Sequence, residues 1–145
     1  MRAAIGVAQA IARSRWRGQM GLVFKICGED EWRRAEKEKV FRGSAVDLRD
    51  GFIHFSTAEQ LAETAARHFG GRRDLLLIAI DVEALGQALR YEPSRGGALF
   101  PHLYGPLPLF AVRFVVTMPL CENGVHLLPS LERLRSHDVA RLSSR

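Results

Sequence analysis

Apolar residues along the chain gather in short runs that predict β-strands. Residues 22–27 are rich in β-forming side chains and predict a buried strand. Residues 75–80 are continuously apolar, which is typical of a central strand covered on both faces. Apolar residues alternate with others over residues 110–118, and this pattern predicts a half-exposed strand. The residues expected on its apolar face are Phe110, Val112, Phe114, Val116 and Met118.

Helical segments lie between these runs. Residues 29–39 begin with acidic side chains and end with lysines, as the helix dipole favours, and they predict a helix. A second helix is expected after residues 56–60, which offer a capping box in either of two registers, and it stops at Gly70. The residues expected on its buried face are Leu61, Ala65, His68 and Phe69. A single helical turn is expected at residues 82–85.

The remaining segments predict short strands and loops. Residues 52–55 and 89–92 each predict a strand. The segments expected to be loops are 42–44, 48–51 and 93–97, followed by the proline-studded segment 100–108. Strands and helices intersperse without strict βαβ alternation, so we expect an α+β fold with a mixed, largely antiparallel sheet and packed helices.

The charge of the chain is concentrated at its ends. The net charge is +5, but residues 1–20 carry four arginines and no acid, and residues 130–145 carry four arginines against two acids. Residues 21–129 hold 13 basic and 14 acidic side chains. We therefore expect one domain over 21–129, an extension over 1–20 that is poorly ordered, and a basic tail over 130–145. A body without excess positive charge argues against nucleic-acid binding.

The cysteines and the start of the chain bear on its location. Cys27 and Cys121 lie far apart and form no CxxC motif, so we favour two reduced thiols over a disulfide. No apolar run is long enough to span a bilayer. The short apolar stretch near the start is followed by arginines where a secretory signal would have small residues. A surface-binding segment and a plain extension both fit it; we favour the extension and a cytoplasmic protein.

His54 marks the first candidate site. It lies at the end of a predicted strand that leads into a helix, beside the hydroxyls of Ser56 and Thr57. A strand end that meets a helix N-terminus suits an anionic or carbonyl-bearing ligand. The alternative is that the hydroxyls only cap the helix and that His54 is a satisfied, half-buried histidine.

His102 and Tyr104 mark the second candidate site. They are two residues apart, so in an extended segment their side chains point the same way. Such a pair can polarise a ligand by hydrogen bonds, and a histidine can exchange protons near neutral pH. A rigid loop in which Tyr104 covers the core explains the same residues equally well.

A third candidate is the glycine-rich turn that contains Glu92 and Arg95. Its glycines allow close backbone approach, and Arg95 is suited to clamp a phosphate or carboxylate. The spacing is not that of a phosphate-binding P-loop. No histidine or cysteine spacing indicates a metal site, and no GxSxG elbow indicates a serine hydrolase.

These motifs occur in an order that resembles a known family. The segments that carry the resemblance are 24–27, 41–44, 47–60, 64–69 and 91–107, with Trp32 and Ala35. They resemble the bacterial family known as domain of unknown function nine-five-two, some members of which are labelled glutathione S-transferase. The chain has neither the thioredoxin-like half nor the all-helical half of that transferase class. The resemblance covers about residues 22–129, and it implies that both histidine segments belong to one site.

The family is also similar, more distantly, to the ADP-ribosyltransferase-like fold. That resemblance places Lys25 where those enzymes have an early histidine, and residues 51–57 at the corner that packs around nicotinamide. The chain departs from the pattern because it has lysine at the first position and no evident catalytic glutamate on the last core strand. It implies an enzyme, or a degenerate relative, that binds NAD or another nucleotide and transfers an ADP-ribosyl or phosphate group. The alternative is a non-catalytic module that binds a small acidic ligand or a partner.

Overall fold

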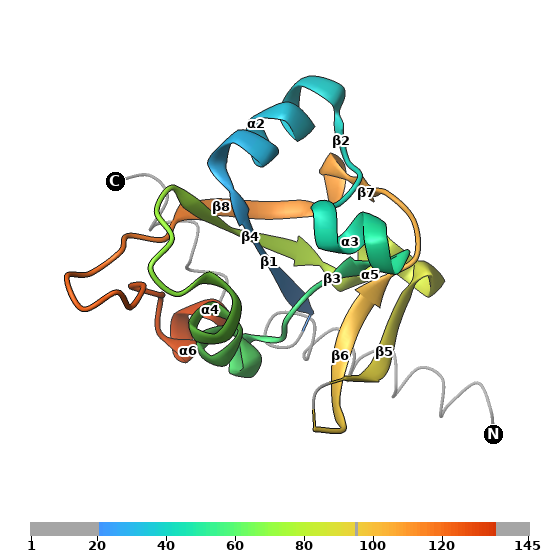
Figure 1. Cartoon of the computed structure of the whole chain (residues 1–145). Coiled ribbons are helices and arrows are strands. Elements are labelled where there is room, and N and C mark those ends of the chain that lie inside the picture. Colours follow the sequence, from blue (N-terminus) through green and yellow to red (C-terminus); the bar gives the residue numbers. More distant parts are fainter. Residues whose placement is uncertain (1–20, 95, 136–145) are drawn as a thin grey trace.

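The computed structural model describes residues 21–94 and 96–135 of the chain. The fold is α+β, as the sequence predicts, and every strand pairing between the described elements is antiparallel, where a mixed, largely antiparallel sheet was expected. The α-helices, 3₁₀ helices (η) and strands follow one another as shown in Figure 1. In chain order they are β1 (Leu22–Gly28), α2 (Glu29–Glu38), β2 (Val40–Phe41), α3 (Ala45–Asp50), β3 (Ile53–His54), η1 (Ala58–Gln60), α4 (Leu61–Phe69), β4 (Leu75–Asp81), α5 (Val82–Leu85), η2 (Gly86–Ala88), β5 (Leu89–Ser94), β6 (Ala98–Leu103), β7 (Leu107–Pro108), η3 (Leu109–Ala111), β8 (Val112–Thr117) and α6 (Leu131–Arg135).

The central sheet has the order β1-β4-β8, and β4 lies in the middle as its continuous apolar run predicts. Alternate residues of β4 enter two separate hydrophobic clusters, one on each face. Trp32 and Ala35 of α2 join the cluster on one face, and Leu61 and Ala65 of α4 join the cluster on the other. Burial of each large aliphatic side chain stabilises the fold by about 1.5–3 kcal/mol, so this covered strand anchors the domain.

A second sheet with the order β3-β6-β5 is attached to the free edge of β1. The attachment is an antiparallel bridge in which Phe24 and Ser56 exchange two backbone hydrogen bonds, of 2.8 and 2.9 Å. In Figure 1 the hairpin of β5 and β6 projects to one side of the central sheet, while α4 and α6 lie on another. The bridge brings β1 next to β3, and β3 pairs in turn with β6, so three segments distant in sequence meet at one place.

Three segments predicted as loops contain regular structure instead. The predicted loop 48–51 is wrong in part, because α3 extends to Asp50 and ends at Gly51, whose positive φ of 86° closes the helix. The start of α3 is fixed by Asp47, whose Oδ2 accepts a hydrogen bond from Ser44 N–H at 2.9 Å. The proline-studded segment 100–108 and the loop 93–97 contribute to strands as well, because β5 and β6 pair from Leu89–Leu103 to Ser94–Ala98.

The last strand and α4 also depart from their predicted patterns. Phe110 lies in η3 with 80% of its surface exposed, and the strand begins only at Val112. A register shift in the pairing of β4 with β8 places Val112 and Phe114 against opposite clusters, so the expected single apolar face is wrong. His68 is exposed at the edge of a cavity rather than buried in the core, because the last turn of α4 reaches the cavity rim.

The expected domain limits stay a prediction. The extension over residues 1–20 and the part of the basic tail beyond 135 lie outside the described residues. Within the described part of the tail, α6 packs Leu134 against the cluster that contains Leu61. None of the helices in the described ranges is long and apolar enough to cross a membrane.

Candidate functional site

A cavity of about 570 Å³ opens where β1, β3, β6, α3 and α4 meet. Cavities of this size are typical of small-molecule sites. Its wall contains both predicted histidines, and aromatic, hydroxyl and charged side chains surround them. The residues that line it are Phe24, Lys25, Ile26, Glu31, Ser44, Ala45, Val46, Asp47, Arg49, Asp50, His54, Phe55, Ser56, Thr64, His68, Phe69, Arg72, Ser94, Phe100 and His102.

An ion pair between Lys25 and Asp47 forms the floor of this site. Lys25 Nζ lies 2.7 Å from Asp47 Oδ2, and only 8% and 1% of the two side chains are exposed. The ammonium group also donates a hydrogen bond to the His54 backbone carbonyl at 3.0 Å. Buried charges persist only when they are paired and hydrogen-bonded. Each of these two side chains therefore needs the other in order to stay charged inside the protein.

Asp47 is fully engaged by donors. Its Oδ1 accepts from the backbone N–H of His54 at 3.0 Å and contacts His54 Nδ1 at 2.7 Å, while Oδ2 accepts from Lys25 and Ser44 N–H. Burial alone would raise the pKa of Asp47, but the His54 hydrogen bond and the Lys25 charge outweigh it and hold the pKa well below its usual range. Asp47 is therefore an ionised acceptor, and His54 Nδ1 donates to it.

The other nitrogen of His54 faces a second carboxylate. His54 Nε2 lies 3.0 Å from Asp50 Oδ2, and Asp50 Oδ1 accepts from Arg49 Nε at 3.0 Å. The Arg49 hydrogen bond is the main cause that lowers the pKa of Asp50, with a smaller contribution from His54. About a third of the His54 side chain is exposed, so the imidazole is held firmly but remains accessible from the cavity.

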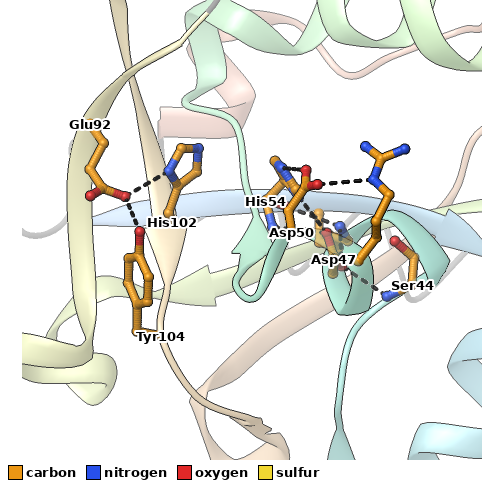
Figure 2. Close-up of polar contacts among 9 residues, drawn as sticks. Ser44, Asp47, Asp50, His54, Glu92, His102 and Tyr104 are labelled. Atoms are coloured by element: carbon orange, nitrogen blue, oxygen red, sulfur yellow. Dashed lines mark hydrogen bonds and ion pairs between the residues drawn. The ribbon is translucent and has the colours of Figure 1, made fainter.

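His102 is held by a similar arrangement on the neighbouring strand. His54 and His102 are direct cross-strand partners in the β3–β6 pairing, and their rings lie 5.4 Å apart edge to face. Figure 2 shows Glu92 Oε1 between His102 Nδ1, at 2.9 Å, and the Tyr104 hydroxyl, at 2.7 Å. These two hydrogen bonds, that of Tyr104 first, lower the pKa of Glu92. Phe52 stacks on the His102 ring at 4.1 Å.

Hydroxyl, aromatic and cationic side chains line the α4 side of the cavity. The hydroxyls of Ser56 and Thr64 lie 3.0 Å apart. The exposed Arg72 guanidinium lies over the Phe69 ring at 5.3 Å, a cation–π distance. An aromatic surface beside hydroxyls and a guanidinium suits a ligand that carries both a flat ring and an anionic group, such as a nucleotide. Within residues 21–94 and 96–135, no three histidine, cysteine or acidic side chains are grouped to hold a metal ion.

The structure brings most of the predicted site residues together. His54, Ser56 and His102 line the cavity, whereas Glu92 and Tyr104 do not: Glu92 hydrogen-bonds to His102, and Tyr104 hydrogen-bonds to Glu92. Thr57 does not line the cavity; its backbone N–H donates to Gln60 Oε1 at 3.0 Å, which is a helix cap. The predicted role of Arg95 falls on a residue outside the described ranges.

Several residues of the cavity were not predicted as site residues. Lys25 carried a visible signal, because it interrupts an apolar strand where a charge is costly unless paired. Asp47 and Asp50 carried a weaker one, as acids seven and four residues before a histidine. Arg72 carried none, since its place depends on how the chain turns from α4 into β4.

Comparison with known proteins identifies the family. Residues 26–115 match the family described as protein of unknown function (DUF952), and the chain belongs to this family. The expected family membership is therefore confirmed. Among the curated proteins, none matches the chain.

Two solved structures of protein CC0527 from Caulobacter crescentus are similar to this chain. The crystal structure has 48% sequence identity and a TM-score of 0.72, and the match covers 74% of this chain and 94% of that one. The solution NMR structure has 49% identity and a TM-score of 0.67, with coverage of 73% and 91%. The similarity to the ADP-ribosyltransferase-like fold stays a prediction.

Proposed function

We propose that this protein binds a small nucleotide-like anion in the cavity and that His54 and His102 polarise the bound ligand. The observation that carries the proposal is that two histidines, each fixed by a carboxylate at Nδ1, face one cavity from adjacent strands. A carboxylate that orients an imidazole in this way is the usual second partner of a functional histidine.

The chemistry of the remaining wall supports the ligand class. Asp47 and Asp50 are matched by Lys25 and Arg49, so their charges are already compensated. Among the described residues, the Arg72 guanidinium makes no ion pair, and it is available to an anionic group. Ser56 and Thr64 supply hydroxyls for a ribose or phosphate.

The narrower form of the proposal is an enzyme that transfers an ADP-ribosyl or phosphate group, with NAD as a candidate ligand. In such a reaction His54 or His102 would exchange a proton with the leaving group or the acceptor. The resemblance of the family to the ADP-ribosyltransferase-like fold is the reason for proposing a transferase. The cavity residues support only the binding of the ligand.

A non-catalytic binding module is the second candidate, and a specific observation favours it. Lys25 Nζ and both ring nitrogens of His54 already contact protein acceptors. A general base must come within hydrogen-bond reach of the proton that it takes up, and both nitrogens of His54 already lie beside carboxylates. Incubation of the protein with NAD, followed by chromatography, separates the two candidates: release of nicotinamide supports the enzyme, and intact bound NAD supports the module.

Thermal unfolding with NAD, ADP-ribose, AMP and inorganic phosphate tests binding itself. A ligand at 100 times its Kd stabilises a protein by about 2.7 kcal/mol, which for a domain of this size raises Tm by roughly 10 °C. Arg72→Gln should abolish most of the shift. The matched control is Arg34→Gln, which changes an exposed arginine of α2 outside the cavity wall and should leave the shift intact. If no ligand moves the Tm of the wild type, the proposal is wrong.

A further inference from the structure

The two histidines differ in one respect that bears on the chemistry of the ligand. Both ring nitrogens of His54 lie within 3.0 Å of a carboxylate oxygen, at 2.7 Å from Asp47 and 3.0 Å from Asp50. His102 meets a carboxylate only at Nδ1, and its Nε2 is buried without a hydrogen-bond partner among the described residues. The inference below rests on the proposed binding function and assigns each histidine its part in it.

The two carboxylate contacts of the His54 ring indicate where its protons lie: Nδ1 hydrogen-bonds to Asp47, and Nε2 lies at ion-pair distance from Asp50. An ionised carboxylate is an acceptor and repels a lone pair, so each nitrogen beside one is favoured to carry a hydrogen. An imidazole with two such nitrogens is the imidazolium cation. Two carboxylates contact the His54 ring itself, whereas the Lys25 ammonium, which pairs with Asp47, contacts only the backbone carbonyl of His54.

The contacts of His102 indicate a neutral ring, in contrast to the cationic ring of His54. Glu92 Oε1 accepts a hydrogen bond from the Tyr104 hydroxyl, and the same oxygen contacts His102 Nδ1. Because a carboxylate oxygen is an acceptor toward both groups, His102 Nδ1 carries the hydrogen. The Nε2 atom then bears a lone pair in the neutral ring. A second imidazolium 5.4 Å from that of His54 would add repulsion between like charges, and only 4% of His102 is exposed to water that could screen it.

We infer that His54 is a fixed cationic donor and His102 a fixed neutral acceptor, and that the ligand of this cavity is an anion that also carries a hydroxyl. The hydroxyl donates its hydrogen to His102 Nε2 and so satisfies the buried nitrogen. The anionic oxygens lie toward the His54 imidazolium and Arg72. Buried polar atoms without a partner are rare in folded proteins, and a bound hydroxyl is the partner that this one lacks.

Asp50 holds the place of the ligand's anion in this arrangement. Its carboxylate contacts both His54 Nε2 and Arg49 Nε, as an anionic ligand would. Asp50 is the last residue of α3, and 30% of its side chain is exposed, so it can yield to a competing anion without disturbing the core. Asp50→Ala should therefore raise the affinity for a phosphate-bearing ligand.

Nitrogen NMR of the histidine rings in the full chain tests the assignment before any ligand is added. Long-range ¹H–¹⁵N spectra of the histidine-labelled wild type at pH 7, assigned through the backbone, distinguish protonated from unprotonated ring nitrogens. We expect both nitrogens of His54 to be protonated, and His102 to be protonated at Nδ1 alone. A bare nitrogen on His54, or a hydrogen on His102 Nε2, would overturn the inference whether or not a ligand is ever found.

Two variants separate positioning from mere structure. Glu92→Gln can donate to Nδ1 as well as accept from it, so the His102 ring should lose its single tautomer while the His54 signals stay unchanged. Tyr104→Phe is the control, because it removes the hydrogen bond from Tyr104 to Glu92 but keeps the one between Glu92 and His102. An unchanged His102 spectrum in Glu92→Gln would contradict the positioning role of Glu92.

Titration with AMP and its 2′,3′-dideoxy analogue then tests the ligand class. AMP should shift the His102 Nε2 signal, the dideoxy compound should not, and both should shift the His54 signals. Equal shifts of His102 with both compounds would refute the hydroxyl contact. If neither compound moves any cavity signal while the free-protein spectra are as expected, the proposed nucleotide binding is wrong and the proton assignment stands.

Discussion

Replacing Lys25 with methionine keeps most of the side-chain volume but removes the ammonium group that lies 2.7 Å from Asp47 Oδ2. Asp47 then remains as a buried carboxylate that is held only by its bonds to His54 and Ser44. Breaking a buried ion pair from one side costs about 3–5 kcal/mol. Because the remaining donors still stabilise the carboxylate, we expect the lower end, about 3 kcal/mol.

Urea unfolding followed by circular dichroism measures this loss. With an m-value of about 1.5 kcal/mol per molar, the midpoint should fall by about 2 M. The control is Arg113→Met, which breaks a pair with Asp81, of 3.0 Å, on the surface, where half of the arginine side chain is exposed. Surface pairs are worth about 0–1 kcal/mol, so the control should unfold close to the wild type.

A double-mutant cycle shows whether the loss arises from the pair itself. Lys25→Met and Asp47→Asn combined should be less destabilising than the sum of the two single changes, by at least about 1 kcal/mol. If Lys25→Met costs less than about 1 kcal/mol, or no more than Arg113→Met, the floor of the site is not a tight ion pair and our reading of the Asp47–His54 geometry fails.

Three further predictions concern the loop before α3, acid stability and the thiols. Gly43→Ala should destabilise the fold more than Gly71→Ala in the same urea assay. Both glycines have positive φ, but a new Cβ at Gly43 would lie 2.7 Å from Asp47 Cβ, whereas nothing lies within 4 Å at Gly71. Equal losses of stability would contradict the close approach at Gly43. Asp47 has a folded-state pKa below its unfolded value of about 3.9, so it stabilises the fold above that pH, and this stability is lost as pH falls through the folded pKa. Asp47→Asn should therefore flatten the dependence of stability on pH below about pH 4. An unchanged slope would refute the lowered pKa of Asp47. Burial, with the Glu31 charge, raises the pKa of Cys27 to about 12, whereas Cys121 is exposed; Ellman's reagent should find one thiol in the native protein and two in urea, and two fast native thiols would show that Cys27 is accessible.

Much of the fold follows from local patterns. The run at residues 75–80 predicted the middle strand because a strand covered on both faces needs no polar residue, and β4 has that place. The helix α3 was missed because six residues give a weak periodic signal, and its cap uses Asp47, which lies between two segments predicted as loops. The start of β8 was misplaced because a register shift, which depends on the partner strand, breaks the alternation.

The site was predictable in its histidines but not in its contacts. His54 and His102 stood out as histidines in short apolar segments, yet their direct pairing depends on the β3–β6 register, which the sequence does not reveal. The Lys25–Asp47 pair joins residues on different elements and needed the Phe24–Ser56 bridge to bring β1 beside β3. Side chains that meet only through tertiary contacts have no fixed spacing in the sequence, so no sequence motif reveals them.

Chemical-shift mapping of the ¹⁵N-labelled full chain with NAD and with AMP tests the proposed binding most directly. We predict that at least one of these ligands shifts the backbone amides of His54, Ser56 and Thr64, which line the cavity, and leaves those of β8 unchanged. No shift with either ligand, or shifts spread over β8 and α2 and absent from the cavity wall, would contradict the account.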